Sequence, residues 1–182
     1  MTCDIVIIGG GLAGLTAALE LQRAGRQCVV VAGGVSLHET PRAEYIAAGG
    51  VFLRGDFVKR GEWEGNRLMR VWTRNLGDEA IEAADFILAT GRFFSKGLVS
   101  TMDEIYEPVF GCDVRYEKDR SKWVNLDFFG VQPFEEFGVE TDSAGRALIN
   151  GEVAENLFVA GEILCGHKDI EQTALAVCRN IM

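Results

Sequence analysis

Three glycines near the start of the chain have types and spacing that could bind a phosphate group. Gly9, Gly11 and Gly14 follow the G-x-G-x-x-G pattern, between a strand-like run and a helical pattern. Gly9 would make the tight turn, Gly11 would let a phosphate approach the backbone, and Gly14 would let the helix pack closely on the strand. The N–H groups of Leu12 and Ala13, with the helix dipole, would attract the anion. The alternative is a glycine-rich turn in an ordinary α/β protein.

Two further apolar runs end in small residues that suit contact with a flat cofactor. One run leads into Thr90 and Gly91, and the other leads into Gly161 and Glu162. Ligands of parallel α/β sheets bind outside the carboxyl ends of the strands, and glycine allows a close backbone approach. We therefore predict cofactor contacts at these four residues.

The remaining candidates for chemistry are weak. Arg92 and Lys96 follow the second run and could attract a phosphate, although solvated surface residues are an equal alternative. The five cysteines are widely spaced and the two histidines lie far apart, so we predict neither a disulfide framework nor a metal site. No catalytic acid, base or nucleophile is assigned from the sequence.

The periodicity predicts an α/β fold with a Rossmann-like doubly wound parallel sheet and a β-meander crossover. This is the arrangement of FAD/NAD(P)-binding domains. We expect strands at 5–8, 27–32, 86–91 and 156–162, and helices at 12–24, 42–48 and 169–182 with Asp169 as N-cap. We expect a hairpin or meander over 49–73, in which 51–53 is the first strand and 64–66 a turn.

Composition excludes several classes of protein. The 182 residues include 27 acidic against 18 basic side chains, a formal net charge of −9, which argues against general nucleic-acid binding. There is no run of ~18 apolar residues to cross a membrane and no basic leader, so we expect a cytoplasmic protein without direct membrane insertion. We expect one domain over 1–182, with an aromatic-rich elaboration at 97–142 whose rings mostly pack in the core.

The end of the second strand lacks a residue that adenosine binding normally uses. An acidic side chain usually stands there and holds the ribose, but this chain has Ala32, Gly33 and Gly34. The lack of this acid favours FMN, which has no adenosine, over FAD. If the cofactor were FAD, the backbone of Val58 would be a candidate contact for adenine.

Five segments resemble the B subunit of anaerobic glycerol-3-phosphate dehydrogenase. They are WTRN (72–75), ATGRFFSKGL (89–98), EPVFGCDV (107–114), QPFEEFGVETD (132–142) and ENLFVAG (155–161). The resemblance implies an FMN-containing flavoprotein that oxidises glycerol 3-phosphate to dihydroxyacetone phosphate and passes electrons towards quinone. It also implies two partners, an FAD-bearing A subunit and a membrane-anchoring iron–sulfur C subunit, through which the chain would reach the inner membrane.

The same resemblance implies that much of the family's length is missing here. Members of that family are more than twice as long, and their substrate domain lies mainly between the second strand and the meander, where this chain has only residues 33–48. Two alternatives therefore stay open: a non-catalytic nucleotide-binding scaffold subunit that docks through 97–137, and an NAD(P)-binding reductase domain.

Overall fold

The main sheet of the protein is built from parallel strands and determines where a ligand can bind. The structure is a computed structural model that describes residues 1–34, 38–127, 129–167 and 169–182. In spatial order the sheet contains β11 (Arg146–Ile149), β12 (Glu152–Val159), β6 (Ala80–Leu88), β1 (Thr2–Ile8), β2 (Cys28–Ala32) and β3 (Val51–Arg54). All but β11 run parallel, so their carboxyl ends lie at one edge. The predicted Rossmann-like fold is confirmed.

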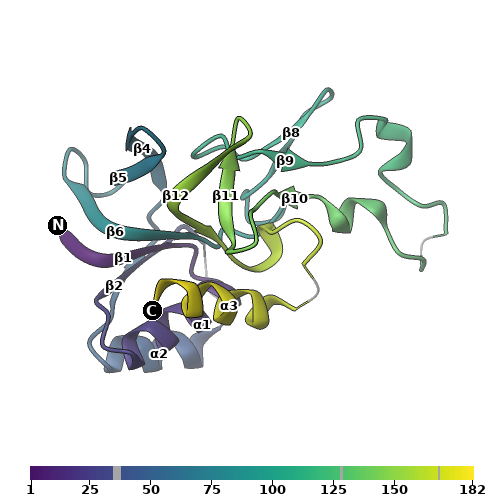
Figure 1. The fold of residues 1–182 in the computed structure, drawn as a ribbon. Coiled ribbons are helices and arrows are strands. Elements are labelled where there is room, and N and C mark those ends of the chain that lie inside the picture. Colours follow the sequence, from purple (N-terminus) through teal and green to yellow (C-terminus); the bar gives the residue numbers. More distant parts are fainter. Residues whose placement is uncertain (35–37, 128, 168) are drawn as a thin grey trace.

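Three helices cover one face of this sheet (Figure 1). They are α1 (Leu12–Arg23), α2 (Glu39–Ala47) and α3 (Ile170–Ile181). Side chains alternate along a strand, so Ile5 and Ile7 of β1 pack against the helices, while Val6 and Ile8 pack on the opposite face. The sheet is thus buried on both sides, which explains its continuous apolar runs.

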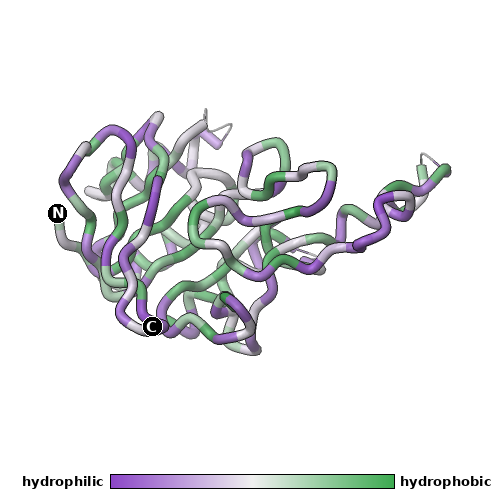
Figure 2. The backbone as a smooth tube through the Cα atoms, turned by 90° about the horizontal axis from the view of Figure 1, so that it is seen from above, coloured by the Kyte–Doolittle hydropathy of each residue, from purple (hydrophilic) through white to green (hydrophobic). Residues whose placement is uncertain are grey.

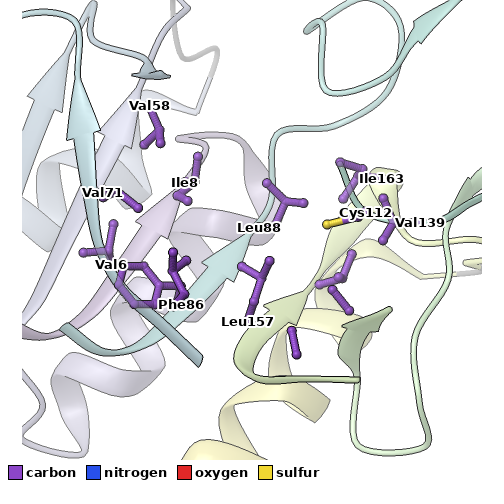
Figure 3. Close-up of a cluster of buried hydrophobic side chains, with 14 of the residues drawn as sticks. Val6, Ile8, Val58, Val71, Phe86, Leu88, Cys112, Val139, Leu157 and Ile163 are labelled. Carbon is purple, nitrogen blue, oxygen red and sulfur yellow. The ribbon is translucent and has the colours of Figure 1, made fainter. Parts of the chain in front are cut away.

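A β-meander covers the opposite face. Strands β4 (Val58–Glu64) and β5 (Arg67–Thr73) form an antiparallel hairpin, and β5 pairs with the first half of β6. Figure 3 shows the core beneath it, where Val58 and Val71 approach Val6 and Phe86. The same apolar cluster continues to Cys112, a residue of the 97–142 region. One core therefore joins the meander, the sheet and part of the elaboration.

The prediction for residues 51–53 is wrong in its pairing. They form β3, which runs parallel to β2 at the edge of the main sheet and not as part of the meander. The helix α2 makes the crossover between β2 and β3, and its fully buried Tyr45 packs against Gly50 and donates a hydrogen bond to the Cys28 carbonyl. A run of three apolar residues suits either pairing, so the tertiary contacts of α2 decided it.

Other expected elements differ mainly in length. The helices α1 and α3 are confirmed, and the Asp169 side chain caps α3 by accepting a hydrogen bond from the Gln172 N–H at 3.0 Å. The helix α2 begins three residues earlier than expected, at Glu39. The strand β6 already begins at Ala80, and no sequence pattern indicated β11. We also expect a connection over 35–43 from its turn and cap residues, of which 35–37 lie outside the described residues.

The 97–142 region forms short elements and an arm that projects from the sheet (Figures 1 and 2). Its elements are β7 (Val99–Ser100), β8 (Ile105–Tyr106), β9 (Val114–Arg115), β10 (Gly138–Val139) and the 3₁₀ turns η1 (Arg120–Lys122) and η2 (Pro133–Glu136). Phe137 is buried, and Tyr116 and Trp123 pack around it edge to face. Leu126 and Phe129 are instead almost fully exposed, and Phe128 lies outside the described residues.

All five cysteines are free thiols in the structure. Burial raises the pKa of Cys28 to about 12 and that of Cys178 to about 11, so neither forms a reactive thiolate near neutral pH. The described residues contain no cluster of three acidic, histidine or cysteine side chains able to hold a metal ion. Within that same part of the chain, no helix is long and apolar enough to span a bilayer.

Asn156 joins the meander to the main sheet, and its replacement tests that link. Its side chain is 1% exposed; it accepts a hydrogen bond from Leu68 N–H at 2.9 Å and donates to the carbonyls of Leu68 and Ala84 at 2.8 and 2.7 Å. We expect Asn156→Leu to lower the free energy of unfolding by about 3 kcal/mol, because the N–H and carbonyl groups of the buried Leu68 lose this partner. The Ala84 carbonyl keeps a hydrogen bond from Arg67.

Thermal or urea unfolding measures this change. The matched control is Asn180→Leu, since Asn180 donates a single exposed hydrogen bond to the Ala144 carbonyl. The control should cost about 1 kcal/mol or less. Equal losses in the two variants would contradict the role given to Asn156.

Candidate functional site

A cavity of about 580 Å³ opens at the carboxyl edge of the sheet. Its walls come from the ends of β1, β2 and β6, the start of α1, the segment after β3, and η3 (Gly161–Ile163) after β12. Its size lies within the usual range for small-molecule and cofactor sites. Seven of the nine predicted cofactor-binding residues line it: Gly9, Gly11, Leu12, Ala13, Thr90, Gly91 and Glu162.

Gly9 sits at a point where the backbones of β1 and β6 touch. Its φ of +123° is in the region that favours glycine, and a Cβ there would press on the carbonyl group of Ala89. The Gly9 N–H donates to the Val31 carbonyl at 2.8 Å, so the turn is also fixed to β2. Gly9 is therefore required by both conformation and space.

Gly11 is a glycine for a different reason. Its φ of −79° and ψ of −171° suit any residue, and a Cβ there would meet no described atom within 4 Å. Since Gly11 lines the cavity, that Cβ would stand in the space available to a ligand. Gly11 is also the N-cap of α1, which has neither a side-chain cap nor an acidic residue in its first turn among the described residues. The first N–H groups of α1 are thus left for an anion.

Two of the predicted residues do not line the cavity and act in packing. A Cβ on Gly14 would collide with the Gly9 carbonyl oxygen, so Gly14 lets α1 approach the turn. Gly161 has a φ of +82°, and a Cβ there would lie 2.6 Å from the methyl group of Ala13. The Gly161 N–H donates to the Thr173 hydroxyl at 2.7 Å, so it is already paired within the protein.

Thr90, Gly91 and Glu162 meet on the other side of the glycine turn. The Thr90 hydroxyl is buried and has no hydrogen-bond partner among the described residues, which suits a group that a bound ligand would complete. A Cβ on Gly91 would lie 3.8 Å from a carboxylate oxygen of Glu162, so the ends of β6 and β12 are close together. These residues offer a hydroxyl, a backbone surface and an acceptor carboxylate to one ligand.

The sequence offers Arg92 and Lys96 as residues that could attract a phosphate, and of these two only Lys96 lines the cavity. Lys96 lines it, with the uncommon positive φ of +62°. Arg92 is turned away, and its guanidinium donates to the carbonyls of Phe134 and Glu135 and lies 3.2 Å from both ring nitrogens of His167. Only Lys96 of this pair is therefore placed to attract a ligand phosphate.

Sequence reasoning missed part of the cavity wall at the ends of β2 and β3. Asp56 and Phe57 line the cavity together with Gly33 and Val58, the last of which was considered only for an FAD cofactor. Asp56 and Phe57 were missed because residues 51–53, which form β3, were assigned to the meander. A parallel β3 places the residues that follow it at the ligand-binding edge.

A buried carboxylate shapes one further part of the wall. Glu107 is 2% exposed and accepts hydrogen bonds from the N–H groups of Val109, Phe110 and Gly111 at 2.9, 2.7 and 3.0 Å. Burial raises the pKa of Glu107, and the backbone donors partly offset this effect. The bonds hold Val109 against the cavity, so Glu107 acts on the site through the backbone.

The fold and this cavity define a nucleotide-binding domain of the Rossmann-like type. The fold is shared by an oxidoreductase from Agrobacterium tumefaciens, with a TM-score of 0.59 at 14% identity, covering 99% of this chain and 96% of the other. A thioredoxin reductase from Gloeobacter violaceus gives a TM-score of 0.57 at 15% identity, covering 100% and 93%. At such identities the likeness concerns the fold alone.

The chain belongs to the FAD binding domain family, whose model matches residues 4–43 and 36–170. The domain is therefore a flavin-binding one.

Sequence relatives are more specific about the protein type. The chain is 40% identical over 139 residues to a protein of Yersinia enterocolitica named as the B subunit of anaerobic glycerol-3-phosphate dehydrogenase, covering 76% of this chain and 33% of the relative. It is 41% identical over 140 residues to the protein of that name in Vibrio vulnificus, covering 75% and 32%. The resemblance seen in the sequence is confirmed, and the chain spans about a third of the length of these relatives.

Replacement by alanine should affect stability differently at Gly11 and at Gly14, because Gly11 borders open space and Gly14 packs against the Gly9 carbonyl. Helix propensity alone predicts that Gly14→Ala stabilises α1 by about 1 kcal/mol. We expect it instead to destabilise the protein by about 1–3 kcal/mol, because its Cβ collides with the Gly9 carbonyl.

Gly11→Ala is the matched control, measured by urea unfolding without ligand. Its backbone is unstrained and its surroundings are open, so we expect no loss of stability. A stabilised Gly14→Ala variant would show that the turn and helix are not packed as described.

Proposed function

We propose that this chain binds FAD in the cavity at the carboxyl edge and is the flavin-binding part of a glycerol-3-phosphate dehydrogenase of the B-subunit type. One observation carries the proposal: the continuous cavity joins the glycine turn to the ends of the neighbouring strands. The N–H groups at Gly11, Leu12 and Ala13 would hold the phosphates, while Gly9 and Gly14 shape the turn. Lys96 adds positive charge beside them.

The other predicted contacts fit the flavin end of the cofactor. Thr90 and Gly91 would approach the flavin, with the unpaired Thr90 hydroxyl as a donor or acceptor. Glu162 would accept hydrogen bonds from ribityl hydroxyl groups, since a carboxylate repels phosphate and attracts hydroxyl donors. Gly161 would act indirectly by keeping η3 close to Ala13.

The sequence favoured FMN, but the shape of the cavity favours FAD. The cavity lining includes Thr90, which follows β6 on one side of β1, and Gly33 and Asp56, which follow β2 and β3 on the other side. FMN would occupy only the side of Thr90, because its phosphate is its end. The matched family model is also described as an FAD binding domain.

The reaction we propose is oxidation of glycerol 3-phosphate to dihydroxyacetone phosphate, with electrons passed towards quinone. A bound flavin supplies the hydride acceptor, and the chain contributes binding, orientation and electrostatics. This part of the proposal rests on the relatives' names and on a chain that spans about a third of their length. We assign no catalytic acid or base to this chain.

The proposal includes two partner subunits. We propose that residues 1–182 form one flavin-binding domain, largely without the family's substrate domain, and join an FAD-bearing A subunit and a membrane-anchoring iron–sulfur C subunit. The complex would hold the cytoplasmic chain at the periphery of the inner membrane. The projecting arm supports docking to such a partner, because it exposes the apolar side chains of Val124, Leu126, Phe129 and Val131.

The same exposed side chains favour the second candidate function, a non-catalytic scaffold subunit.

The visible spectrum of the purified protein separates these functions. We expect the absorption peaks of oxidised flavin, or their appearance on reconstitution, and release of FAD on heating. A colourless protein that takes up neither FAD nor FMN would refute the flavoprotein proposal and leave the scaffold. Binding of NADH alone would indicate a pyridine-nucleotide reductase domain.

The position of the site is tested by Gly11→Val, which fills the phosphate approach. We expect a folded protein that has lost at least about 90% of its flavin, since a bound phosphate and this side chain would share the same space. The control is Ala24→Val, an exposed position at the end of α1 outside the cavity. Flavin content measured by absorbance should be unchanged in the control, and full flavin content in Gly11→Val would contradict the assigned site.

A further inference from the structure

The end of β2 lacks the usual ribose-binding acid, yet a carboxylate stands beside it. Asp56 follows β3, is 2% exposed, and lines the same cavity as the glycine turn. The N–H groups of Gly55 and Asp56 both donate to the carbonyl of Ala32, the last residue of β2, at 2.8 and 3.3 Å. The neighbouring strand thus brings an acid to the place where the second strand has none.

The two oxygens of the Asp56 carboxylate are used unequally. The Oδ1 atom accepts hydrogen bonds from the N–H groups of Phe57 and Asn75, both at 2.9 Å. The Oδ2 atom accepts no hydrogen bond from a described residue, and none of the ion pairs found in that part of the chain involves Asp56. A carboxylate oxygen without a donor from the protein can accept a hydrogen bond from a ligand hydroxyl group.

We propose that the Asp56 carboxylate replaces the missing acid of β2 and accepts a hydrogen bond from a ribose hydroxyl of the adenosine half of FAD. The inference rests on the proposed function, because it assigns one end of the same cavity. The Oδ1 bonds hold the side chain in place, and Oδ2 would accept the hydroxyl group of the ligand.

The residues around Asp56 suit the rest of an adenosine group. The Phe57 ring is 43% exposed, lines the cavity, and lies so close to Gly33 that a Cβ on that glycine would collide with it. The Arg74 guanidinium lies 5.0 Å from the centre of this ring and donates to the Gly55 carbonyl at 2.9 Å. An aromatic ring held in this way offers an apolar surface to a nucleobase. Because Gly33 carries no side chain, the Phe57 ring can lie directly against the end of β2.

Asp56→Asn tests the proposal with little structural change. The amide oxygen can keep both bonds made by Oδ1, while an uncharged NH₂ group replaces Oδ2. We expect FAD to bind about ten- to a hundredfold more weakly by calorimetry, because a hydrogen bond to a charged group is lost. FMN has no adenosine, so its affinity should change by less than about twofold.

Asp113→Asn is the matched control. Asp113 also accepts backbone hydrogen bonds, from the N–H groups of Asn150 and Gly151 at 3.0 and 2.7 Å, but it does not line the cavity. This variant should bind FAD and FMN as the unchanged protein does. An Asp56→Asn variant that keeps full FAD affinity would overturn the inference.

A measurement on the unchanged protein makes the test independent of how the variant folds. We expect ADP to bind about tenfold or more tightly than 2′,3′-dideoxy-ADP, and we expect this ratio to fall towards one in Asp56→Asn. Equal binding of the two nucleotides by the unchanged protein would refute the role of the ribose. Failure to bind any flavin or ADP would instead refute the proposed function itself. Binding of FMN without FAD would keep the flavoprotein proposal and overturn this inference.

Discussion

The close approach of parallel strand ends is the constraint on which the rest of this structure depends. Backbone hydrogen bonds run from Gly9 to Val31, from Ala89 to Ile8 and from Ala160 to Leu88, at 2.8 to 3.0 Å. They hold the carboxyl ends of four neighbouring strands level at one edge. Because the backbones of β1 and β6 touch at Gly9, side chains are excluded there, and the space above the edge remains open for a ligand.

Buried polar side chains position the backbone around the site. Asn156 joins β12 to the meander and to β6, and Glu107 fixes the loop that carries Val109. Both side chains are almost completely buried, and both are satisfied mainly by backbone groups. Their role in ligand binding is indirect, since Asn156 holds the meander to the main sheet and Glu107 holds the loop that follows it.

The cavity is divided into regions of different chemistry. Backbone N–H groups and the dipole of α1 lie at its centre, which suits phosphates. Hydroxyl and carboxylate groups stand at the end of β6 and in η3, which suits the ribityl chain and the flavin. Asp56 and Phe57 stand at the end of β3, which suits adenosine. A chain with a formal net charge of −9 would depend on these local donors to bind an anionic cofactor.

Local signals in the sequence determined the glycine turn, the helices α1 and α3, the β4–β5 hairpin and the family resemblance. Each depends on residues close together in the chain, whose periodicity, capping and turn chemistry act over short distances. The tertiary structure decided the partner of β3 and, with it, the place of Asp56. A three-residue apolar run carries no information about which strand it will join, since pairing depends on residues distant in sequence. The sequence therefore predicted the glycine turn to which we assign the phosphates and missed the carboxylate that follows the neighbouring strand.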